Sequence, residues 1–302
     1  MLGKAPAHQY VETKGFDWRP IAFAGLYRPR DRNRSVALVM GASRGIGRQI
    51  AIDLASNGYA VMLAAKTTSD ANKTSPFPPD PNSSASTINT VEREIRETGG
   101  QAASVSVDVR DAGQVQNAVD ETVRVFGKLD VLVYNSGAIW WSSVENTPLK
   151  RFKLMQQVNP EGLYATVQAT LPHFQSNGWH GRIVVVAPPI YSRFFRGKTA
   201  YAVGKVGMSV LVKGLAMDFV RQKRDNMAIT GIWPASSIES AATEFNKSQD
   251  KSYKEDLRKP YSVIPGSTPR RIMPAQFPIL EVAEQDDEGK RMDSIKIRAA
   301  KI

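Results

Sequence analysis

The chain has 302 residues, no cysteine, and 40 lysine and arginine residues against 29 aspartate and glutamate residues, which gives a formal charge of +11. This length can bury one substantial hydrophobic core, and the lack of cysteine excludes disulfides and thiol chemistry. Three histidines without ligand spacing predict no metal site, and no apolar stretch is long enough to cross a bilayer.

The first 34 residues show no clear hydrophobic periodicity and end in a basic run from Arg28 to Arg34. We interpret residues 1–34 as an N-terminal extension. It lacks the pattern of a signal peptide, and Glu12 and Asp17 are atypical of a mitochondrial presequence. The predicted location is therefore cytoplasmic. The final residues, Ala300 to Ile302, are only loosely similar to the peroxisomal signal Ser-Lys-Leu.

A short apolar run, Val36–Met40, leads into a glycine-rich turn and then into a helical pattern. In such a unit, free backbone N–H groups and the helix dipole face an anion, and glycines let the backbone approach phosphates closely. The spacing is Gly-x-x-x-Gly-x-Gly rather than Gly-x-Gly-x-x-Gly. We predict a pyrophosphate site, whose candidate residues are Gly41, Ser43, Arg44, Gly45, Ile46 and Gly47.

The helix after this turn is expected to be amphipathic. Ile46, Ile50 and Leu54 recur every four residues, which predicts that they face the core. Arg48 and Asp53 would then point the other way.

The residues after the second predicted strand, Val61–Ala65, bear on the choice of nucleotide. An acidic residue there would accept a hydrogen bond from the ribose 2′-OH of NAD. This chain has Lys66 instead, and Arg44 lies in the glycine turn. Two cations suit a 2′-phosphate, so NADP(H) is predicted in preference to NAD. Solvated basic loop residues are the alternative interpretation.

Strand-like and helical patterns alternate through the rest of the chain. This alternation predicts an α/β fold of the Rossmann type: a doubly wound parallel sheet in a single domain, with right-handed crossovers and helices on both faces. From Lys66 to Ser86 the chain is rich in Ser, Asn, Pro and Thr, which predicts a mobile surface loop near the adenosine end of the nucleotide. The remaining predicted strands are Ala103–Val107, Val131–Tyr134, Ile183–Val186 and Ala228–Trp233, and the helices lie near Thr90–Glu97, Val115–Phe126, Leu149–Phe174 and Tyr201–Phe219.

Tyr201 and Lys205 are four residues apart in a predicted helix, so their side chains share a face. A tyrosine ordinarily holds its proton until about pH 10, and a nearby cation favours the phenolate. Such a pair can donate a proton to a carbonyl oxygen or take one from an alcohol near neutral pH. A core aromatic residue beside a solvated lysine is the alternative.

In this order, the motifs resemble the short-chain dehydrogenase/reductase superfamily, and more narrowly its hydroxysteroid dehydrogenase-like subgroup. The resemblance runs from about Ser35 to about Pro260 and implies a bound nicotinamide nucleotide. The motifs that carry it are the Gly41–Gly47 turn, Ala65-Lys66-Thr67, Asp108-Val109-Arg110-Asp111, Asn135-Ser136-Gly137, Val158-Asn159 before Gly162, Tyr201 with Lys205, and Trp233 to Ala242, which includes Ile238 and Ser240.

The resemblance also implies roles for individual residues. Tyr201 would be the proton donor. Lys205 would lower the pKa of Tyr201 and bind the ribose. Asn159 would bind a water of the proton relay. Asp108 would meet the adenine ring. The implied nucleotide-binding set is completed by Val109, Asn135, Gly137, Ile238 and Ser240.

One position departs from the family pattern. The fifth strand of the family normally ends in a serine that hydrogen-bonds the substrate carbonyl, whereas this chain has Ala187. Losing such a donor costs on the order of a hundredfold in rate. Ser142, Ser143, Tyr191 and Ser192 are candidate replacements. A non-catalytic NADP-binding or interaction protein is therefore the alternative to an enzyme.

Several aromatic residues follow the fourth and fifth predicted strands, where ligands of parallel sheets bind. They predict a bulky apolar or aromatic carbonyl or alcohol as the substrate, and core or subunit packing is the alternative. The aromatic residues concerned are Trp140, Trp141, Tyr191, Phe194, Phe195 and Trp233.

The predicted division of the chain is 1–34, 35–260 for the Rossmann domain, and 261–302 for a divergent tail. The tail is polar and weakly patterned, which is typical of disorder, and the resemblance ends before it.

Basic residues are spread along the chain without a nucleic-acid module, so no nucleic-acid partner is expected. Relatives usually pair through two helices, so a homodimer or homotetramer is the expected assembly.

Overall fold

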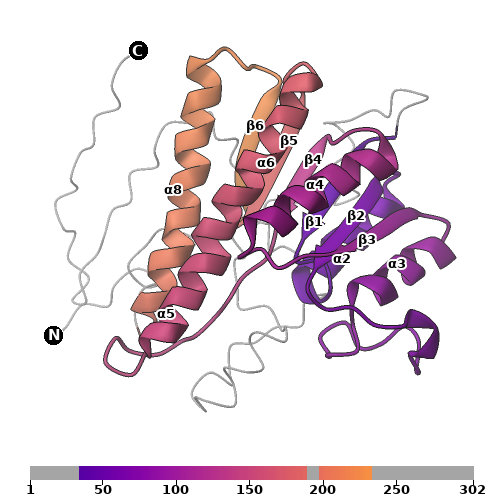
Figure 1. The fold of residues 1–302 in the computed structure, drawn as a ribbon, viewed down its shortest axis with the longest axis horizontal. Helices are drawn as coiled ribbons and strands as arrows, with labels where there is room; N and C mark the ends of the chain where they lie inside the picture. Colours follow the sequence, from indigo (N-terminus) through magenta and orange to yellow (C-terminus); the bar gives the residue numbers. More distant parts are fainter. Residues whose placement is uncertain (1–33, 189–196, 233–302) are drawn as a thin grey trace, which may run out of the picture. The chain divides into compact units, whose positions relative to one another are not determined.

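The computed structural model describes residues 34–188 and 197–232. Six parallel strands form one sheet in the order β3-β2-β1-β4-β5-β6 (Figure 1). β2 and β3 are added on one side of β1, and the chain then returns to add β4, β5 and β6 on the other side. The strands are β1 (Val36–Met40), β2 (Ala60–Ala65), β3 (Gln101–Ser106), β4 (Val131–Tyr134), β5 (Gly181–Val186) and β6 (Met227–Ile232).

Helices cover both faces of this sheet. Buried side chains of α4, α6 and α8 form one core layer, and those of α2 and α3 form the other (Figure 1). The predicted doubly wound α/β architecture is confirmed. The helical elements are α2 (Gly45–Ser56), η1 (Ala71–Lys73), α3 (Ile88–Glu97), α4 (Ala112–Phe126), α5 (Leu149–Gln156), η2 (Gln157–Glu161), α6 (Gly162–Ser176) and α8 (Thr199–Arg221).

The strand register brings the carboxyl ends of β2, β1 and β4 to one edge. Met40 is level with Ala64 on one side and with Tyr134 on the other. All five residues of β1 are buried, as the continuous apolar run predicts for a central parallel strand. The loops after these strands therefore converge, which is where nucleotides bind in sheets of this topology.

The single helix predicted over Leu149–Phe174 is wrong in one respect. The segment is divided into α5, the π-helical turn η2 and α6. Pro160 lies inside η2. Proline has no N–H and its ring clashes with the preceding turn, which disfavours regular α-helical hydrogen bonding at this point. Asn159 lies in this turn and is fully buried.

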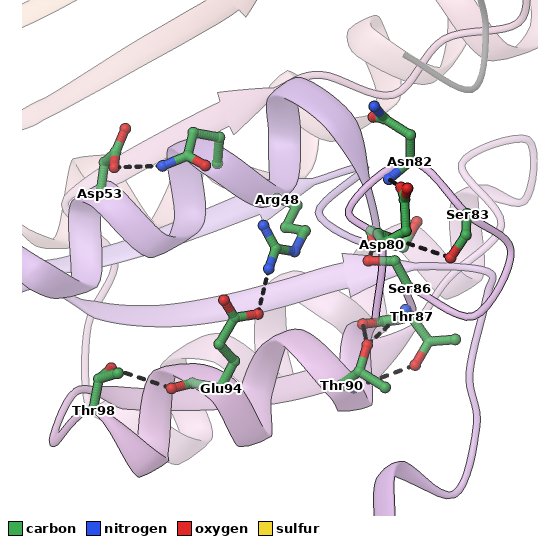
Figure 2. Close-up of polar contacts among 12 residues, drawn as sticks. Arg48, Asp53, Asp80, Asn82, Ser83, Ser86, Thr87, Thr90, Glu94 and Thr98 are labelled. Carbon is green, nitrogen blue, oxygen red and sulfur yellow. Dashed lines mark hydrogen bonds and ion pairs between the residues drawn. The ribbon is translucent and has the colours of Figure 1, made fainter. Parts of the chain in front are cut away.

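The predicted inner face of α2 is right only in part. Ile50 and Leu54 are half-buried and pack against the core. The fully buried positions are Gly47, Arg48, Ala51 and Ala55, so the expectation that Arg48 points outward is wrong. Small residues at every fourth position let the helix lie close to the sheet. Arg48 is drawn inward because its guanidinium pairs with Glu94 of α3 at 2.5 Å (Figure 2).

Over residues 34–188 and 197–232, no helix is long and apolar enough to cross a membrane. Within the same ranges, no three His, Cys, Asp or Glu side chains gather to hold a metal ion. The N-terminal extension up to residue 33, Trp233 and the tail 261–302 lie outside the described residues, so the domain boundaries stay a prediction.

Candidate active site

The glycine-rich turn is closely packed against the end of β4. Gly41 has φ +82°, and a Cβ on it would lie 2.7 Å from the backbone nitrogen of Ser136. A Cβ on Gly47 would lie 2.2 Å from the Gly41 carbonyl oxygen and 2.5 Å from the Asn135 Nδ2 atom. Asn135 Nδ2 donates to the Gly41 oxygen at 3.1 Å, which fixes the turn to β4. The turn therefore has room only for glycine at these two positions.

The segment from Lys66 to Ser86 is largely exposed, as predicted, but it contacts the glycine turn directly. The Gly45 backbone N–H donates to the Pro81 carbonyl at 3.0 Å. Ser86 is fully buried, and its hydroxyl donates to the Ser43 carbonyl at 2.7 Å. Figure 2 shows Ser86 beside the start of α3. The sequence pattern did not reveal these two contacts, since both end on a backbone carbonyl oxygen, which every residue carries.

The two cations predicted for the nucleotide site reach the same corner of the sheet. Arg44 donates from Nη2 to the Thr67 hydroxyl at 3.1 Å, and the neighbouring Lys66 places its Nζ 3.0 Å from an Asp108 carboxylate oxygen. Arg110 also binds Asp108 and holds the pKa of that carboxyl well below its usual range, with a further contribution from Lys66. Asp108 is therefore ionised and bound between two cations.

The side chain of Val109, a predicted nucleotide-binding residue, is buried in the core. Its side chain is 7% exposed and belongs to the core layer under α4 and α6. A Cβ on Gly162 would lie 3.1 Å from the Val109 Cγ2 atom. The side chain packs α6 against the strand end, so only the backbone of Val109 could contact a nucleotide.

Asn159, Gly137 and Lys205 converge on one point. Asn159 accepts a hydrogen bond from the Ala138 N–H at 2.8 Å and donates one to the Ala138 carbonyl at 3.0 Å. A Cβ on Gly137 would lie 3.5 Å from both Asn159 Oδ1 and Lys205 Nζ. Residues from the loop after β4, from η2 and from α8, far apart in the sequence, are thus brought together.

Lys205 is 8% exposed, and its Nζ donates to the Val186 carbonyl at 3.1 Å. Burial lowers the pKa of Lys205 to about 8, because desolvation disfavours the ammonium. Tyr201 precedes it by one turn of α8, so the two side chains lie on one face.

The predicted lowering of the Tyr201 pKa is wrong for the protein alone. Burial raises the pKa of Tyr201 above its ordinary value, because the phenolate loses its hydration. Desolvation outweighs any attraction from Lys205.

Ala187, which replaces the expected serine, is 2% exposed and packs in the core. Of the candidate replacements, Ser143 accepts a hydrogen bond from Asn146 at 3.0 Å, while Tyr191 and Ser192 lie outside the described residues. Sequence reasoning missed Ser209, which is one turn beyond Lys205. The Ser209 hydroxyl is buried and donates to the Pro188 carbonyl at 3.2 Å.

One of the predicted aromatic residues contacts the proposed acid. The Trp141 ring meets the Tyr201 ring edge-on, with centroids 6.3 Å apart. The predicted wall residues Tyr191, Phe194, Phe195 and Trp233, and the predicted nucleotide contacts Ile238 and Ser240, lie outside the described residues.

Comparison with known proteins matches this geometry to a family. A family model described as Enoyl-(Acyl carrier protein) reductase matches residues 41–259. Hydroxysteroid dehydrogenase-like protein 2 from Mus musculus is 38% identical over 208 residues, which cover 68% of this chain and 39% of the mouse protein. The Danio rerio protein of the same name is 38% identical over 209 residues, 68% of this chain and 46% of its own. The chain spans less than half the length of these curated relatives.

Solved structures agree with this match. A short-chain dehydrogenase from Mycobacterium thermoresistibile has a TM-score of 0.61 at 33% identity, covering 76% of each chain. A 7α-hydroxysteroid dehydrogenase complexed with NADH and 7-oxo glycochenodeoxycholic acid has a TM-score of 0.57 at 26% identity, covering 70% of this chain and 74% of that one.

The protein belongs to the short-chain dehydrogenase/reductase superfamily.

Proposed function

We propose that this protein is an NADP(H)-dependent carbonyl reductase, or alcohol dehydrogenase in the reverse direction, that acts on a bulky apolar or aromatic substrate. The observation that carries the proposal is the convergence of Asn159 and Lys205 on Gly137, with Tyr201 one turn from Lys205 on the same face of α8. These are the groups needed to hold a nucleotide and to move a proton.

The residues fit a nicotinamide nucleotide. Gly41 and Gly47 let the turn pack directly against Asn135 and Ser136, and the first turn of α2 directs N–H groups away from its own helix. No acidic residue lies in that first turn to repel a pyrophosphate. Because the Pro81 carbonyl takes the Gly45 N–H, the N–H groups of Ile46 and Gly47 are the proposed pyrophosphate donors.

The bound nucleotide would supply the hydride. Tyr201 would donate its proton to the carbonyl oxygen as that oxygen gains negative charge, so that a carbonyl, a hydride and a proton give one alcohol. Lys205 would then bind the ribose hydroxyls and place a positive charge beside Tyr201, which opposes the effect of burial on the phenol. Asn159 would position a water that returns the proton to Tyr201 through Lys205.

The 7-oxo glycochenodeoxycholic acid of a structural relative supports a large, mostly apolar ketone as the substrate.

The acid role of Tyr201 is tested by Tyr201→Phe. We expect this variant to lose turnover of every member of a panel of ketones and alcohols, with NADPH affinity changed by less than about threefold, because one hydrogen bond of modest energy is lost. Turnover is measured by the rate of NADPH oxidation, and NADPH affinity by fluorescence titration.

Tyr164→Phe is the matched control, since Tyr164 lies on α6 and is 61% exposed. Wild-type turnover in Tyr201→Phe would refute the proposed acid. If the wild-type protein binds NADPH but turns over no member of a broad panel, the non-catalytic alternative, which Ala187 favours, replaces the enzyme proposal.

The preference for NADP(H) is tested by titration with NADPH and NADH. Arg44 and Lys66 place positive charge at this corner, and Lys66 shares Asp108 with Arg110, so we expect NADPH to bind at least about tenfold more tightly, and Arg44→Ala to remove most of that ratio. Lys73→Ala, an exposed lysine in η1, is the control. Equal affinities of the wild type for both nucleotides would contradict the prediction.

A further inference from the structure

Arg44 is held at both of its peptide bonds by the segment that follows β2. The Ser43 carbonyl, in the peptide bond before Arg44, accepts a hydrogen bond from the Ser86 hydroxyl at 2.7 Å. The Gly45 N–H, in the peptide bond after Arg44, donates to the Pro81 carbonyl at 3.0 Å. The two contacts lie on either side of the Arg44 Cα atom, and together they fix its extended backbone conformation.

The guanidinium of Arg44 is held by the same segment. Its Nη2 atom donates to the Thr67 hydroxyl at 3.1 Å, just after the end of β2. Arg44 occupies the N-cap position of α2 but makes no side-chain cap hydrogen bond. Three contacts from one segment therefore determine both the backbone and the side-chain position of this cation.

Ser86 is the fully buried member of these contacts, and it is itself anchored to α3. The next residue, Thr87, is the N-cap of α3 and forms a capping box with Thr90, through hydrogen bonds of 2.9 and 3.3 Å (Figure 2). A hydrogen bond away from water is electrostatically stronger than an exposed one. The Ser86 hydroxyl therefore connects the turn that carries Arg44 to a fixed point of the structure.

We propose that Ser86 is a positioning residue that sets nucleotide specificity: its hydroxyl holds Arg44 in place for a 2′-phosphate. Arg44 is one of the two cations assigned to that phosphate, so this inference rests on the proposed function. A cation that is already ordered loses less conformational freedom when it binds a ligand. Because Ser86 acts through Arg44, its effect is confined to nucleotides that carry the 2′-phosphate.

The test compares two adenosine ligands that differ only in the 2′-phosphate. Titration calorimetry with the whole protein measures the dissociation constants of adenosine 2′,5′-bisphosphate and adenosine 5′-monophosphate. We expect the wild type to bind the bisphosphate about tenfold or more tightly, through charge-assisted hydrogen bonds. Ser86→Ala should reduce this ratio by about fivefold, since Arg44 must then become ordered on binding, and should change the affinity for the monophosphate by less than about twofold.

Ser83→Ala is the matched control. The Ser83 hydroxyl donates to the Asp80 carbonyl at 2.9 Å, a contact within the same segment that does not involve the glycine turn (Figure 2). This variant should keep the wild-type ratio. An unchanged ratio in Ser86→Ala would overturn the inference. An equal loss of affinity for both ligands in Ser86→Ala would overturn it as well, since it would show a general disturbance of the turn.

A double-mutant cycle with Arg44→Ala tests whether Ser86 acts through Arg44. In the Arg44→Ala background, Ser86→Ala should leave the ratio unchanged, because the cation that Ser86 orders is gone. A loss of similar size with and without Arg44 would overturn the inference.

The outcomes separate the inference from the proposed function. Turnover of a ketone with NADPH, together with a ratio that Ser86→Ala does not alter, would overturn the inference while the function stands. The expected ratios without turnover of any ketone would support the inference while the carbonyl reductase proposal fails. Equal affinity of the wild type for the two ligands, or no binding of either, would overturn the inference together with the predicted preference for NADP(H).

Discussion

The burial of Lys205 opposes the positive charge that its proposed role requires. Its ammonium is needed as a positive charge beside Tyr201, yet the side chain is almost completely buried and has a pKa lowered to about 8. Its hydrogen bond to the Val186 carbonyl offsets only part of the lost hydration. A buried lysine that stays charged near neutral pH is a cost in stability that a purely structural residue would not impose, which favours a functional role.

The cost predicts a pH dependence of stability. Because the pKa of Lys205 is about 8 in the folded protein and 10.5 ordinarily, the unfolded chain binds more protons between these values. The contribution of Lys205 to the free energy of unfolding therefore rises with pH across this window and is least favourable below it.

Urea denaturation of the wild type and Lys205→Met, without added nucleotide, measures this effect at about pH 7, 8.5 and 10. We expect the wild type to gain stability relative to the variant as the pH rises. Titrating groups distant from Lys205 are common to both proteins and cancel in the difference. A difference that stays constant with pH would contradict the lowered pKa.

At the scale of elements, a partly buried ion pair joins α2 to α3. The Arg48 side chain is 7% exposed and the Glu94 side chain 22%, and their closest atoms are 2.5 Å apart (Figure 2). This pair connects the helix that follows the glycine turn to the helix that follows the Lys66–Ser86 segment. It thereby fixes two of the elements that surround the proposed pyrophosphate site.

Removing one charge of this pair should destabilise the protein. In Glu94→Gln the Arg48 cation would stay buried without its carboxylate, and we expect the free energy of unfolding to fall by about 2 kcal/mol or more. Glu97→Gln is the control on the same helix: Glu97 pairs with Arg93 at 2.7 Å but is 52% exposed, so a change within about 0.5 kcal/mol is expected. Equal losses in the two variants, measured by urea denaturation, would show that burial of the pair does not matter.

At the scale of the whole molecule, one face of α8 is apolar and exposed. Val203, Val210 and Met217 are spaced by seven residues and are 52%, 62% and 62% exposed. This spacing keeps them on one side of the helix. An apolar stripe of this kind suits a contact between two copies of the chain, in which the same surface meets itself.

We predict that the wild-type protein is at least a dimer and that Val210→Glu with Met217→Glu shifts it toward the monomer. Two buried carboxylates on each copy would face each other across the symmetric contact, where they would be both desolvated and repelled. Light scattering after size-exclusion chromatography measures the mass. Lys73→Glu, at an exposed position of η1, is the control and should leave the mass unchanged. A monomeric wild type would refute the prediction.

The positions of the strands and the type of fold could be predicted because each depends on local patterns. Buried parallel strands must be continuous apolar runs, and short crossovers between them leave few topologies. β1 and β4 begin and end at the predicted residues, and the other strands begin one or two residues earlier. The pairing of Tyr201 with Lys205 was likewise fixed by helical spacing.

Tertiary contacts decided what local patterns could not. The inward turn of Arg48 depends on Glu94, and the contacts of Pro81 and Ser86 with the glycine turn use backbone atoms, which leave no pattern in the sequence. The direction of the Tyr201 pKa shift depends on burial. The sequence by itself therefore determined which residues could form a nucleotide site, because composition and periodicity are local properties. Only the tertiary structure decided which side chains are desolvated and which face one another, because burial and contact depend on segments distant in the chain.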